Sequence, residues 1–310
     1  MNIQDKTDRL STSISRRDFM RATALAVSGA ALGLKAAAPG ASPPARPIIA
    51  FSKPFQTLGA EEMAALVADI GWSGIECPVR KKGQIEPERV GEELPRLVEA
   101  FRRRGLDVPV LVTDIISVHQ PHAETLLRTA SKLGIKRIRL GWFRYTADRP
   151  IPAQLGDFGA ALKDLGAACG DLGIQAGVEN HSGADLFGAP IWDVYTVIRE
   201  QHTRNIGYCF DIGHATVEGG LSWPIQARLA EPYYISVYMK DFIWEKGPEG
   251  WSPTWCPLGE GVVDRSFASR LQKSGYAGPI CQHHEYPLGD QAQMIAHMRK
   301  DLRVLREWLA

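Results

Sequence analysis

The feature that most constrains the fold of this chain is a recurring unit in which a helical segment ends in glycine and an apolar run follows at once. Glycine readily takes the left-handed backbone conformation that ends a helix, so each copy predicts a helix that leads into a buried strand. The copies are Asp69–Glu76, Arg104–Val112, Leu133–Leu140, Leu172–Glu179 and Ser274–Cys281. We therefore expect alternating helices and parallel strands.

The spacing of the units indicates how many there are. One strand plus one helix separates successive glycines, with intervals of 34, 29 and 39 residues between Gly71, Gly105, Gly134 and Gly173. The 102 residues from Gly173 to Gly275 have room for three units, and apolar runs that end at Asp211 and Asp241 fall there. With Ile48–Ser52 at the start, eight units predict an α/β fold, a single-domain (β/α)8 TIM barrel.

Polar side chains end the last four predicted strands. The run Ile174–His181 stops in a carboxylate, an amide and an imidazole, and Ile206–His214, Ile235–Asp241 and Pro279–Glu285 end in a similar way. One polar strand end often only faces water or caps a helix. Four in succession can face one ligand if the sheet curls round on itself, which favours the barrel over the alternative, an open doubly wound sheet.

Composition excludes several classes of protein. The 310 residues are 45% apolar, and the formal net charge of +1 provides no basic field for a phosphate backbone, so we expect no nucleic acid partner. A small neutral ligand fits better. Five cysteines without a CxxC pair indicate neither a disulfide framework nor a zinc ribbon. Whether the chain forms a homo-oligomer is left open.

The N-terminal segment resembles a twin-arginine export signal. Ser15–Arg21 carries the paired arginines and precedes the weakly apolar run Ala22–Leu34, which is too short to span a bilayer. We expect cleavage somewhere between residues 36 and 45, so that residues 1–45 are signal peptide and linker and residues 46–310 form the barrel. The predicted location is periplasmic or secreted, with no membrane contact after cleavage.

Three acidic residues stand at predicted strand ends: Glu179, Asp211 and Glu285. The carboxyl ends of barrel strands converge on one mouth, where three carboxylates would repel one another unless some took up protons or a cation lay between them. Carboxylate ligands favour Mn²⁺ or Mg²⁺, with Co²⁺ or Zn²⁺ also open. Histidines 214, 283 and 284 provide nitrogen donors nearby.

Four short motifs together resemble the xylose isomerase-like barrel family, which includes ketose 3-epimerases, hydroxypyruvate isomerase, inosose dehydratase and, more distantly, endonuclease IV. They are Val178–His181, Asp211–His214, Lys240–Asp241 and Glu285, and the resemblance covers about residues 47–308. It implies that Glu179, Asp211 and Glu285 are metal ligands. It also implies that His214 holds the substrate or orients a ligand.

One position departs from the family pattern. Members usually have a histidine three residues before the acid that closes strand seven, and Tyr238 stands there in this chain. The fourth metal ligand is therefore open: a water, Tyr238 itself, or a histidine of strand eight such as His283 could take that place.

The chemistry that such a site supports is proton transfer beside a carbonyl group. A cation bound to the carbonyl oxygen and the neighbouring hydroxyl oxygen stabilises the enediolate that forms when the carbon between them loses its proton. Glu179 and Glu285 are the candidate base and acid, as the resemblance implies for the epimerases, with His181 and Lys240 as alternatives. We predict a metal-dependent sugar isomerase or epimerase.

Other residues are candidates for contact with a sugar or keto sugar. Glu76 closes the second strand, and Trp142 and Tyr145 follow the fourth. A long loop, residues 242–261, follows strand seven and contains Trp244 and Trp255. Aromatic side chains in an ordered loop of this length predict a lid that contacts substrate.

Two alternative functions remain open. One is a lyase or glycoside-cleaving enzyme that acts on an oxidised (keto) sugar, in which the same enolate expels a substituent. The other is a non-catalytic sugar-binding barrel with a degenerate metal site, for which Tyr238 is the reason. A nuclease is a poor fit, because the chain has no basic surface and no histidine-rich multimetal cluster.

Overall fold

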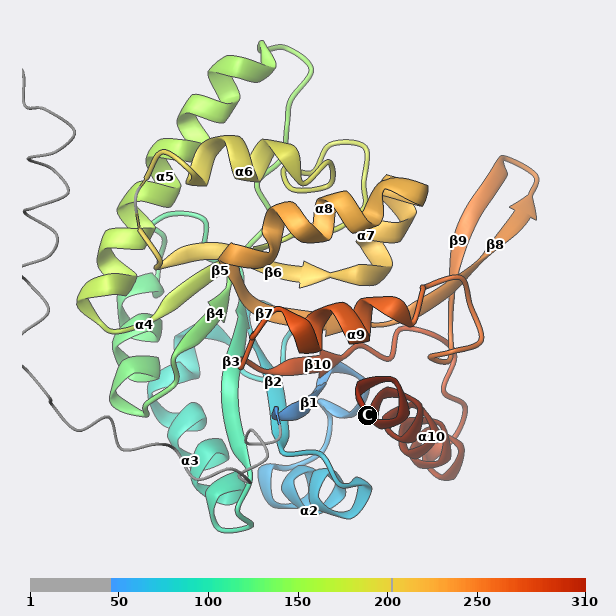
Figure 1. Cartoon of the computed structure of the whole chain (residues 1–310). Coiled ribbons are helices and arrows are strands. Elements are labelled where there is room, and N and C mark those ends of the chain that lie inside the picture. Colours follow the sequence, from blue (N-terminus) through green and yellow to red (C-terminus); the bar gives the residue numbers. More distant parts are fainter. Residues whose placement is uncertain (1–45, 202) are drawn as a thin grey trace, which may run out of the picture. The chain divides into compact units, whose positions relative to one another are not determined.

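Eight parallel strands close into a barrel in the computed structural model, which describes residues 46–310 except His202. Around the barrel the strands follow the order β1, β10, β7, β6, β5, β4, β3, β2, so each pairs with its neighbour in the predicted succession (Figure 1). The predicted (β/α)8 TIM barrel is therefore confirmed. The predicted signal peptide and linker, residues 1–45, lie outside the described residues.

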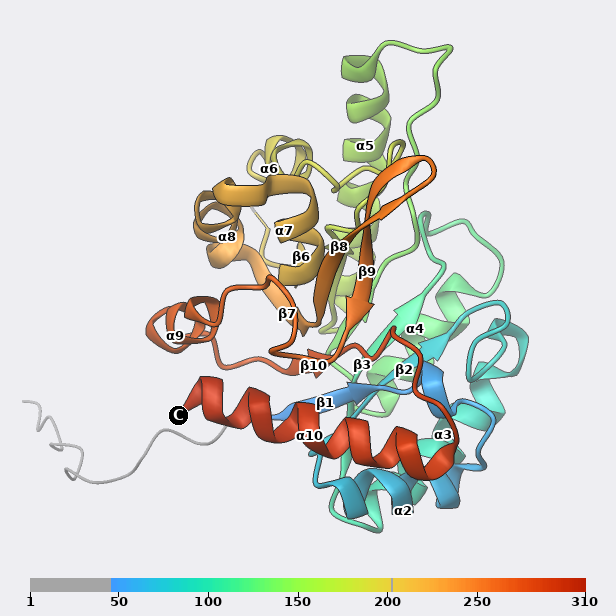
Figure 2. The same ribbon diagram turned by 90° about the vertical axis from the view of Figure 1, so that its right-hand side faces the viewer.

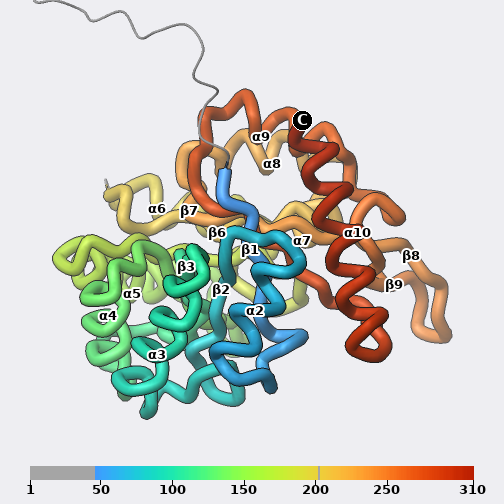
Figure 3. The backbone as a smooth tube through the Cα atoms, turned by 90° about the horizontal axis from the view of Figure 1, so that it is seen from below, coloured from blue at the N-terminus to red at the C-terminus, as the bar shows by residue number. Residues whose placement is uncertain are grey.

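The barrel strands are β1 (Ile48–Phe51), β2 (Gly74–Val79), β3 (Asp107–Thr113), β4 (Arg137–Arg139), β5 (Gln175–Glu179), β6 (Ile206–Asp211), β7 (Tyr234–Met239) and β10 (Ile280–Gln282). The helices are α2 (Ala60–Ile70), α3 (Val90–Arg102), α4 (Ala123–Lys132), α5 (Ile151–Asp171), α6 (Trp192–Ile198), α7 (Ile212–Gly219), α8 (Trp223–Ala230), α9 (Ser266–Lys273) and α10 (Gln291–Leu309). Figure 3 shows these helices arranged around the strands.

The glycines of the sequence repeat end helices as predicted. Gly71 follows α2 with φ 98° and Gly173 follows α5 with φ 66°, both in the left-handed region where a side chain is strained. The backbone N–H of Gly71 closes the last turn on Val67, and the next residues enter β2. The same local chemistry thus sets the passages from helix to strand at the glycines of the repeat.

Each helix packs on the barrel through one apolar face. In α2 this face consists of Met63, Leu66, Val67 and Ile70, all buried. In α10, Asp290 begins the helix with a capping box in which Asp290 and Gln293 satisfy each other's backbone N–H groups. Among the residues that the structure describes, no helix is both long and apolar enough to cross a membrane.

The segment predicted as a long loop after strand seven is instead an antiparallel hairpin, so that prediction was wrong. Its strands are β8 (Asp241–Gly247) and β9 (Gly250–Cys256), with Trp244 opposite Pro253 (Figure 2). The carboxylate of Asp241 accepts the backbone N–H groups of Gly259, Gly261 and Val263, at 2.9 to 3.0 Å. These bonds hold the base of the hairpin against the segment that follows it.

The interior of the barrel has an apolar layer and a polar layer. The apolar layer is a cluster of buried side chains: Ile49, Phe51, Val110, Val112, Cys209, Tyr238 and Cys281. Two residues after Cys209, Tyr238 and Cys281 of this layer, and so on the same inward face, lie Asp211 at the end of β6, Lys240 just after β7 and His283 just after β10. These three belong to the polar layer, which lies at the carboxyl ends of the strands.

Candidate active site

A cavity of about 230 Å³ opens above the polar layer. Its walls come from the carboxyl ends of β1 to β5 and from the chain that follows β10. The lining residues are Phe51, Lys53, Arg80, Val112, Arg139, Trp142, Glu179, His181, His283 and Glu285. Two predicted catalytic carboxylates, Glu179 and Glu285, therefore face one space with His181.

Three buried side chains near this cavity form a group that could hold a divalent cation. Glu179, Asp211 and His283 each offer a ligand atom, and these atoms lie within 4.8 Å of one another. Asp211 Oδ2 is buried with no hydrogen-bond partner in the part of the chain that is described. Two carboxylates and an imidazole suit Mg²⁺ or Mn²⁺, so the residues fit a metal. Glu285, a predicted ligand, does not belong to this group.

Lys240 lies between the acidic residues. Its Nζ donates hydrogen bonds to Glu285 Oε2 and to His214 Nε2, each at 2.7 Å, and forms an ion pair with Asp211 Oδ2 at 3.1 Å. Burial lowers the pKa of the ammonium group, but the charges of Asp211 and Glu285 outweigh this, and the pKa is raised. Lys240 is therefore a fixed positive charge in the centre of the site.

The carboxylates on the two sides of the cavity are both held in the ionised form. Burial raises the pKa of Glu285, but the neighbouring Lys240 outweighs this and lowers the pKa to about 2. Glu179 is also buried, and its ion pair with Arg139 lowers its pKa below the usual range. Asp211 differs, because burial raises its pKa and Lys240 offsets only part of that shift.

His214 is buried, and both of its ring nitrogens are occupied. Burial and then the charge of Lys240 hold the pKa of His214 well below its usual value, so the ring is neutral. An ammonium group only donates, so Nε2 accepts from Lys240 and Nδ1 carries the hydrogen, which it donates to Ser182 Oγ at 2.7 Å. The structure places His214 as a support for Lys240, outside the cavity lining.

His181 has one ring nitrogen free to act. Its Nδ1 lies 2.8 Å from the carbonyl oxygen of Ser182, which only accepts, so Nδ1 carries the hydrogen and Nε2 is an acceptor when the ring is neutral. The ring packs against Trp142, with centroids 4.8 Å apart, and against His214 at 3.8 Å. These contacts fix the imidazole at the wall of the cavity.

Glu76 and Tyr238 lie beneath the cavity. Tyr238 donates to Glu76 Oε1 at 2.5 Å, and His283 Nε2 donates to Glu76 Oε2 at 2.9 Å. Burial lowers the pKa of His283, but its hydrogen bond to Glu76 outweighs this, and the pKa is raised. The tyrosine that replaces the family histidine thus binds Glu76, while His283 joins Glu179 and Asp211.

The predicted aromatic contacts divide into two groups. Trp142 lines the cavity, and the ring of Trp255 covers Lys240, with Nζ 4.2 Å from its centroid. Trp244 lies further out on the hairpin and is 43% exposed. Tyr145 points elsewhere, because its hydroxyl binds Asp193 and its ring packs on Phe158.

Five lining residues were absent from the sequence-based candidates: Phe51, Lys53, Arg80, Val112 and Arg139. Arg139 is the most informative of them, since it is 3% exposed, pairs with Glu179 and lies 4.3 Å from the ring centroid of Trp142. A signal was present in the sequence. Arg139 lies near the carboxyl end of a predicted barrel strand, where a charged side chain can point into the mouth.

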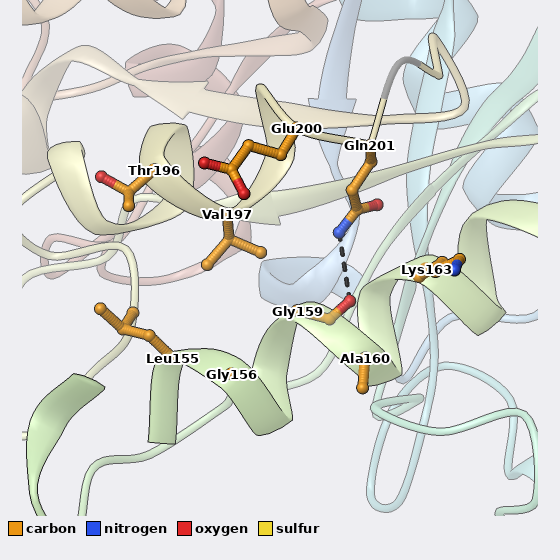
Figure 4. A pocket seen from close by; sticks show the side chains of 9 residues that line it. All are labelled: Leu155, Gly156, Gly159, Ala160, Lys163, Thr196, Val197, Glu200 and Gln201. Atoms are coloured by element: carbon orange, nitrogen blue, oxygen red, sulfur yellow. Dashed lines mark hydrogen bonds between the residues drawn. The ribbon is translucent and has the colours of Figure 1, made fainter. Parts of the chain in front are cut away.

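A larger cavity, of about 580 Å³, lies outside the barrel between α5 and α6 (Figure 4). Its lining includes Leu155, Gly159, Val197 and Gln201, and Gln201 donates to the carbonyl oxygen of Gly159 at 3.2 Å. It has no group of converging acids and bases comparable to the one at the barrel mouth. We therefore assign the chemistry to the smaller cavity, because it brings acids and bases together and the larger cavity does not.

A family model described as the xylose isomerase-like TIM barrel matches residues 64–308 of the chain. The search of curated proteins found no match to the chain. The match runs from within α2 to within α10 and includes Glu179, Asp211 and His283.

Solved structures of similar proteins cover most of the chain. A xylose isomerase-like TIM barrel protein from Mycobacterium smegmatis, in complex with magnesium, is 18% identical with a TM-score of 0.62, over 86% of this chain and 98% of that one. The 3-keto-D-glucoside 4-epimerase of E. coli is 16% identical with a TM-score of 0.66, over 84% and 99%. The D-psicose 3-epimerase of Clostridium cellulolyticum H10, solved with D-tagatose, is 13% identical with a TM-score of 0.66, over 85% and 99%.

Proposed function

Since the chain belongs to the xylose isomerase-like TIM barrel family, we propose that it is a sugar isomerase or epimerase that transfers a proton beside a carbonyl group. One observation carries the proposal: Glu179 at the end of β5 and Glu285 in the chain after β10 face the same cavity, and these two strands lie three places apart around the barrel. A sugar between them would present carbon-bound hydrogens to both carboxylates. The similar epimerases of keto sugars support this reaction class.

The proton transfer begins from ionised carboxylates, because the pKa of each is lowered. Glu179 or Glu285 takes the proton from the carbon next to the carbonyl group. The electron pair of the broken C–H bond forms the carbon–carbon double bond, and the carbonyl oxygen gains the negative charge. For isomerisation, the carboxylic acid formed gives the proton to the former carbonyl carbon, and the proton of the neighbouring hydroxyl group moves to the former carbonyl oxygen. For epimerisation, the other glutamate first takes a proton from water and then protonates the original carbon from the opposite face, while the carbonyl group re-forms. His181 Nε2 and Lys240 Nζ remain alternative sites of proton transfer.

The negative charge on the sugar oxygen needs donors, and the polar layer has them. Lys240 adds a buried positive charge beside Glu285, while its ammonium group is already engaged with His214, Glu285 and Asp211. Arg139 lines the cavity, and its Nε and Nη2 are buried with no hydrogen-bond partner among the described residues. Donors that are already in place stabilise a developing oxyanion without reorganisation.

We propose that a divalent cation, Mn²⁺ or Mg²⁺, binds at Glu179, Asp211 and His283. When bound, such an ion acts as a Lewis acid that polarises the carbonyl group. The magnesium complex of the similar M. smegmatis protein supports this assignment. Asp211 Oδ2 makes no hydrogen bond among the described residues, although it forms an ion pair with Lys240, and it is the oxygen of Asp211 that could bind the cation.

The size and aromatic wall of the cavity support a substrate as small as a single sugar. A volume of about 230 Å³ is below the range of roughly 300–1,000 Å³ that is usual for drug-sized ligands. Trp142 lines the cavity, while Trp255 and the more exposed Trp244 both pack on Phe242 at the hairpin. The proposed substrate is therefore a small keto sugar.

We also propose export by the twin-arginine route, on the basis of Ser15–Arg21 and the apolar run that follows. The protein would then work in the periplasm or outside the cell. Detection of a shortened chain in a periplasmic fraction, and its loss when Arg16 and Arg17 are both replaced by lysine, would test this. Accumulation of the replaced protein outside the cytoplasm would contradict it.

The reaction itself is tested by incubating the purified protein with Mn²⁺ and a panel of keto sugars in deuterated water. We expect deuterium on the carbon beside the carbonyl group of at least one sugar. Glu179→Gln should lower the exchange rate by about 10²–10⁴-fold, and Glu62→Gln, on the outer face of α2, should leave it unchanged. Absence of exchange with every sugar, or full exchange in Glu179→Gln, would contradict the proposal.

A further inference from the structure

We infer that the ammonium group of Lys240 and a divalent cation compete for Asp211, so that Lys240 keeps the metal affinity of the resting protein low. The inference deepens the proposed function at the same site and rests on it for its catalytic meaning. Metal binding itself is measured without sugar and without turnover. The two proposals can therefore fail separately.

Asp211 has one side-chain oxygen to offer. Its Oδ1 accepts the backbone N–H of His214 at 2.9 Å, which caps the start of α7. Its Oδ2 is buried, makes no hydrogen bond within the described part of the chain, and faces Lys240 Nζ at 3.1 Å. A cation that joins the group Glu179, Asp211 and His283 would use the oxygen that the ammonium group already faces.

Two cations at this oxygen would lie very close together. Divalent ions bind carboxylate oxygens at about 2.0–2.6 Å, so an ion on Asp211 Oδ2 would be within about 6 Å of Lys240 Nζ. Water is largely excluded from this buried site, and like charges at that distance repel strongly. Binding of the ion must therefore displace Lys240 or overcome the repulsion.

Lys240 is held in place by its other contacts. Hydrogen bonds of 2.7 Å join Nζ to His214 Nε2 and to Glu285 Oε2, and the ring of Trp255 packs over the ammonium group at 4.2 Å. The side chain is only 2% exposed. Lys240 is thus a built part of the site, unlike a surface lysine that could turn away freely.

The charge balance explains why the two cations compete and why neither is simply excluded. Glu76, Glu179, Asp211 and Glu285 bring four carboxylates to the polar layer, whereas Arg139 and Lys240 are its permanent buried cations. Among these groups alone, counted without the imidazoles and without Lys53 and Arg80 of the cavity lining, two negative charges remain, which is the charge that a divalent ion would neutralise. The attraction for a metal persists, and Lys240 opposes it at one ligand.

The test compares Mn²⁺ binding, measured by calorimetric titration without sugar, in the wild-type protein, Lys240→Met and Lys240→Gln. We expect both variants to bind Mn²⁺ at least tenfold more tightly than wild type. Lys53→Met is the matched control, because Lys53 lines the same cavity and forms no ion pair with Asp211. Its affinity should stay within threefold of wild type. Circular dichroism of the metal-free proteins checks the fold, and Lys240→Gln retains a hydrogen-bond donor to Glu285.

Two results of the binding experiment would overturn the inference. Equal or weaker Mn²⁺ binding in both Lys240 variants would mean that the ammonium group does not oppose the metal. No binding in any of the proteins would mean that removing Lys240 does not release a site. The expected affinities together with no deuterium exchange in any sugar would leave the competition standing and contradict the proposed isomerase or epimerase.

Discussion

The apolar and polar layers of the barrel interior belong to the same strands and the residues just after them, yet only the polar layer contains charged side chains. Cys209 and Cys281 are fully buried in the apolar layer, and two residues later in each case stand Asp211 and His283 in the polar layer. The strand period of two places both members of each pair on the inward face. The side chains that pack the interior and the side chains that can react therefore lie at different depths in the barrel.

The titratable groups of the two layers behave differently. Burial is the main cause that raises the pKa of the Cys209 thiol far above its usual value, so this thiol is inert at neutral pH. In the polar layer burial is opposed by neighbouring charges, as when Arg139 offsets the burial of Glu179. The apolar layer excludes charge, whereas the polar layer stabilises charge by pairing it. The predictions below test this difference.

The largest effect on stability is expected for Arg139→Met. The variant would leave the carboxylate of Glu179 buried without its partner, and breaking a buried ion pair in this way costs about 3–5 kcal/mol of unfolding free energy. Urea denaturation measures the loss. Arg144→Met is the control, because Arg144 and Asp185 form a pair in which both side chains are about half exposed. Its expected cost is below about 1 kcal/mol, and equal losses in the two variants would contradict the pairing account.

A smaller effect is expected for Tyr238→Phe, which lies where the layers meet. The ring stays in the apolar layer, but Glu76 Oε1 loses the hydroxyl that donates to it at 2.5 Å. A buried acceptor that loses its donor costs about 1–3 kcal/mol. Thermal and urea denaturation would show the loss, and an unchanged stability would mean that the hydroxyl does not connect the layers.

The smallest effect is expected in the pH dependence of stability at Glu285. Lys240 lowers the pKa of this carboxylate to about 2, so its ionised form stabilises the folded state above pH 4.5, and this contribution is lost as the pH falls towards 2. Wild type should exceed Glu285→Gln by on the order of 1 kcal/mol at pH 6, since Glu285 is partly exposed and screened. The difference should shrink between pH 5 and pH 2. A constant difference would contradict the pairing with Lys240.

The fold could be predicted because its signals are local. Gly71 and Gly173 each end a helix within a few residues of the strand that follows, so chain order alone reveals the repeat. The hairpin β8–β9 was missed because the proline and tryptophan content of residues 242–261 was interpreted as a lid. A turn signal was present in the sequence, because Gly247 and Gly250 flank Pro248 and Glu249 between the two strands.

The candidate site could be predicted only in part. Strand ends are local features, so Glu179 and Asp211 were identified, and the structure brings them together with His283. Glu285 lies beyond the end of β10 at Gln282, where strand alternation no longer fixes the direction of a side chain. Arg139 pairs with Glu179, which is 40 residues away in the sequence, and Lys240 pairs with Glu285, which is 45 residues away. The fold determines which acid each of these long side chains reaches. No local pattern contains that information.

The most direct test of the central claim compares one substitution from each layer in the deuterium exchange reaction. Glu285→Gln changes a carboxylate of the cavity, and Val110→Ala removes two methyl groups from a residue of the apolar layer that does not line the cavity. At equal concentrations of folded protein, we expect Glu285→Gln to lower the exchange rate by at least about 10²-fold and Val110→Ala to leave it unchanged. Full exchange in Glu285→Gln, or an equal loss in both variants, would contradict the assignment of chemistry to the polar layer.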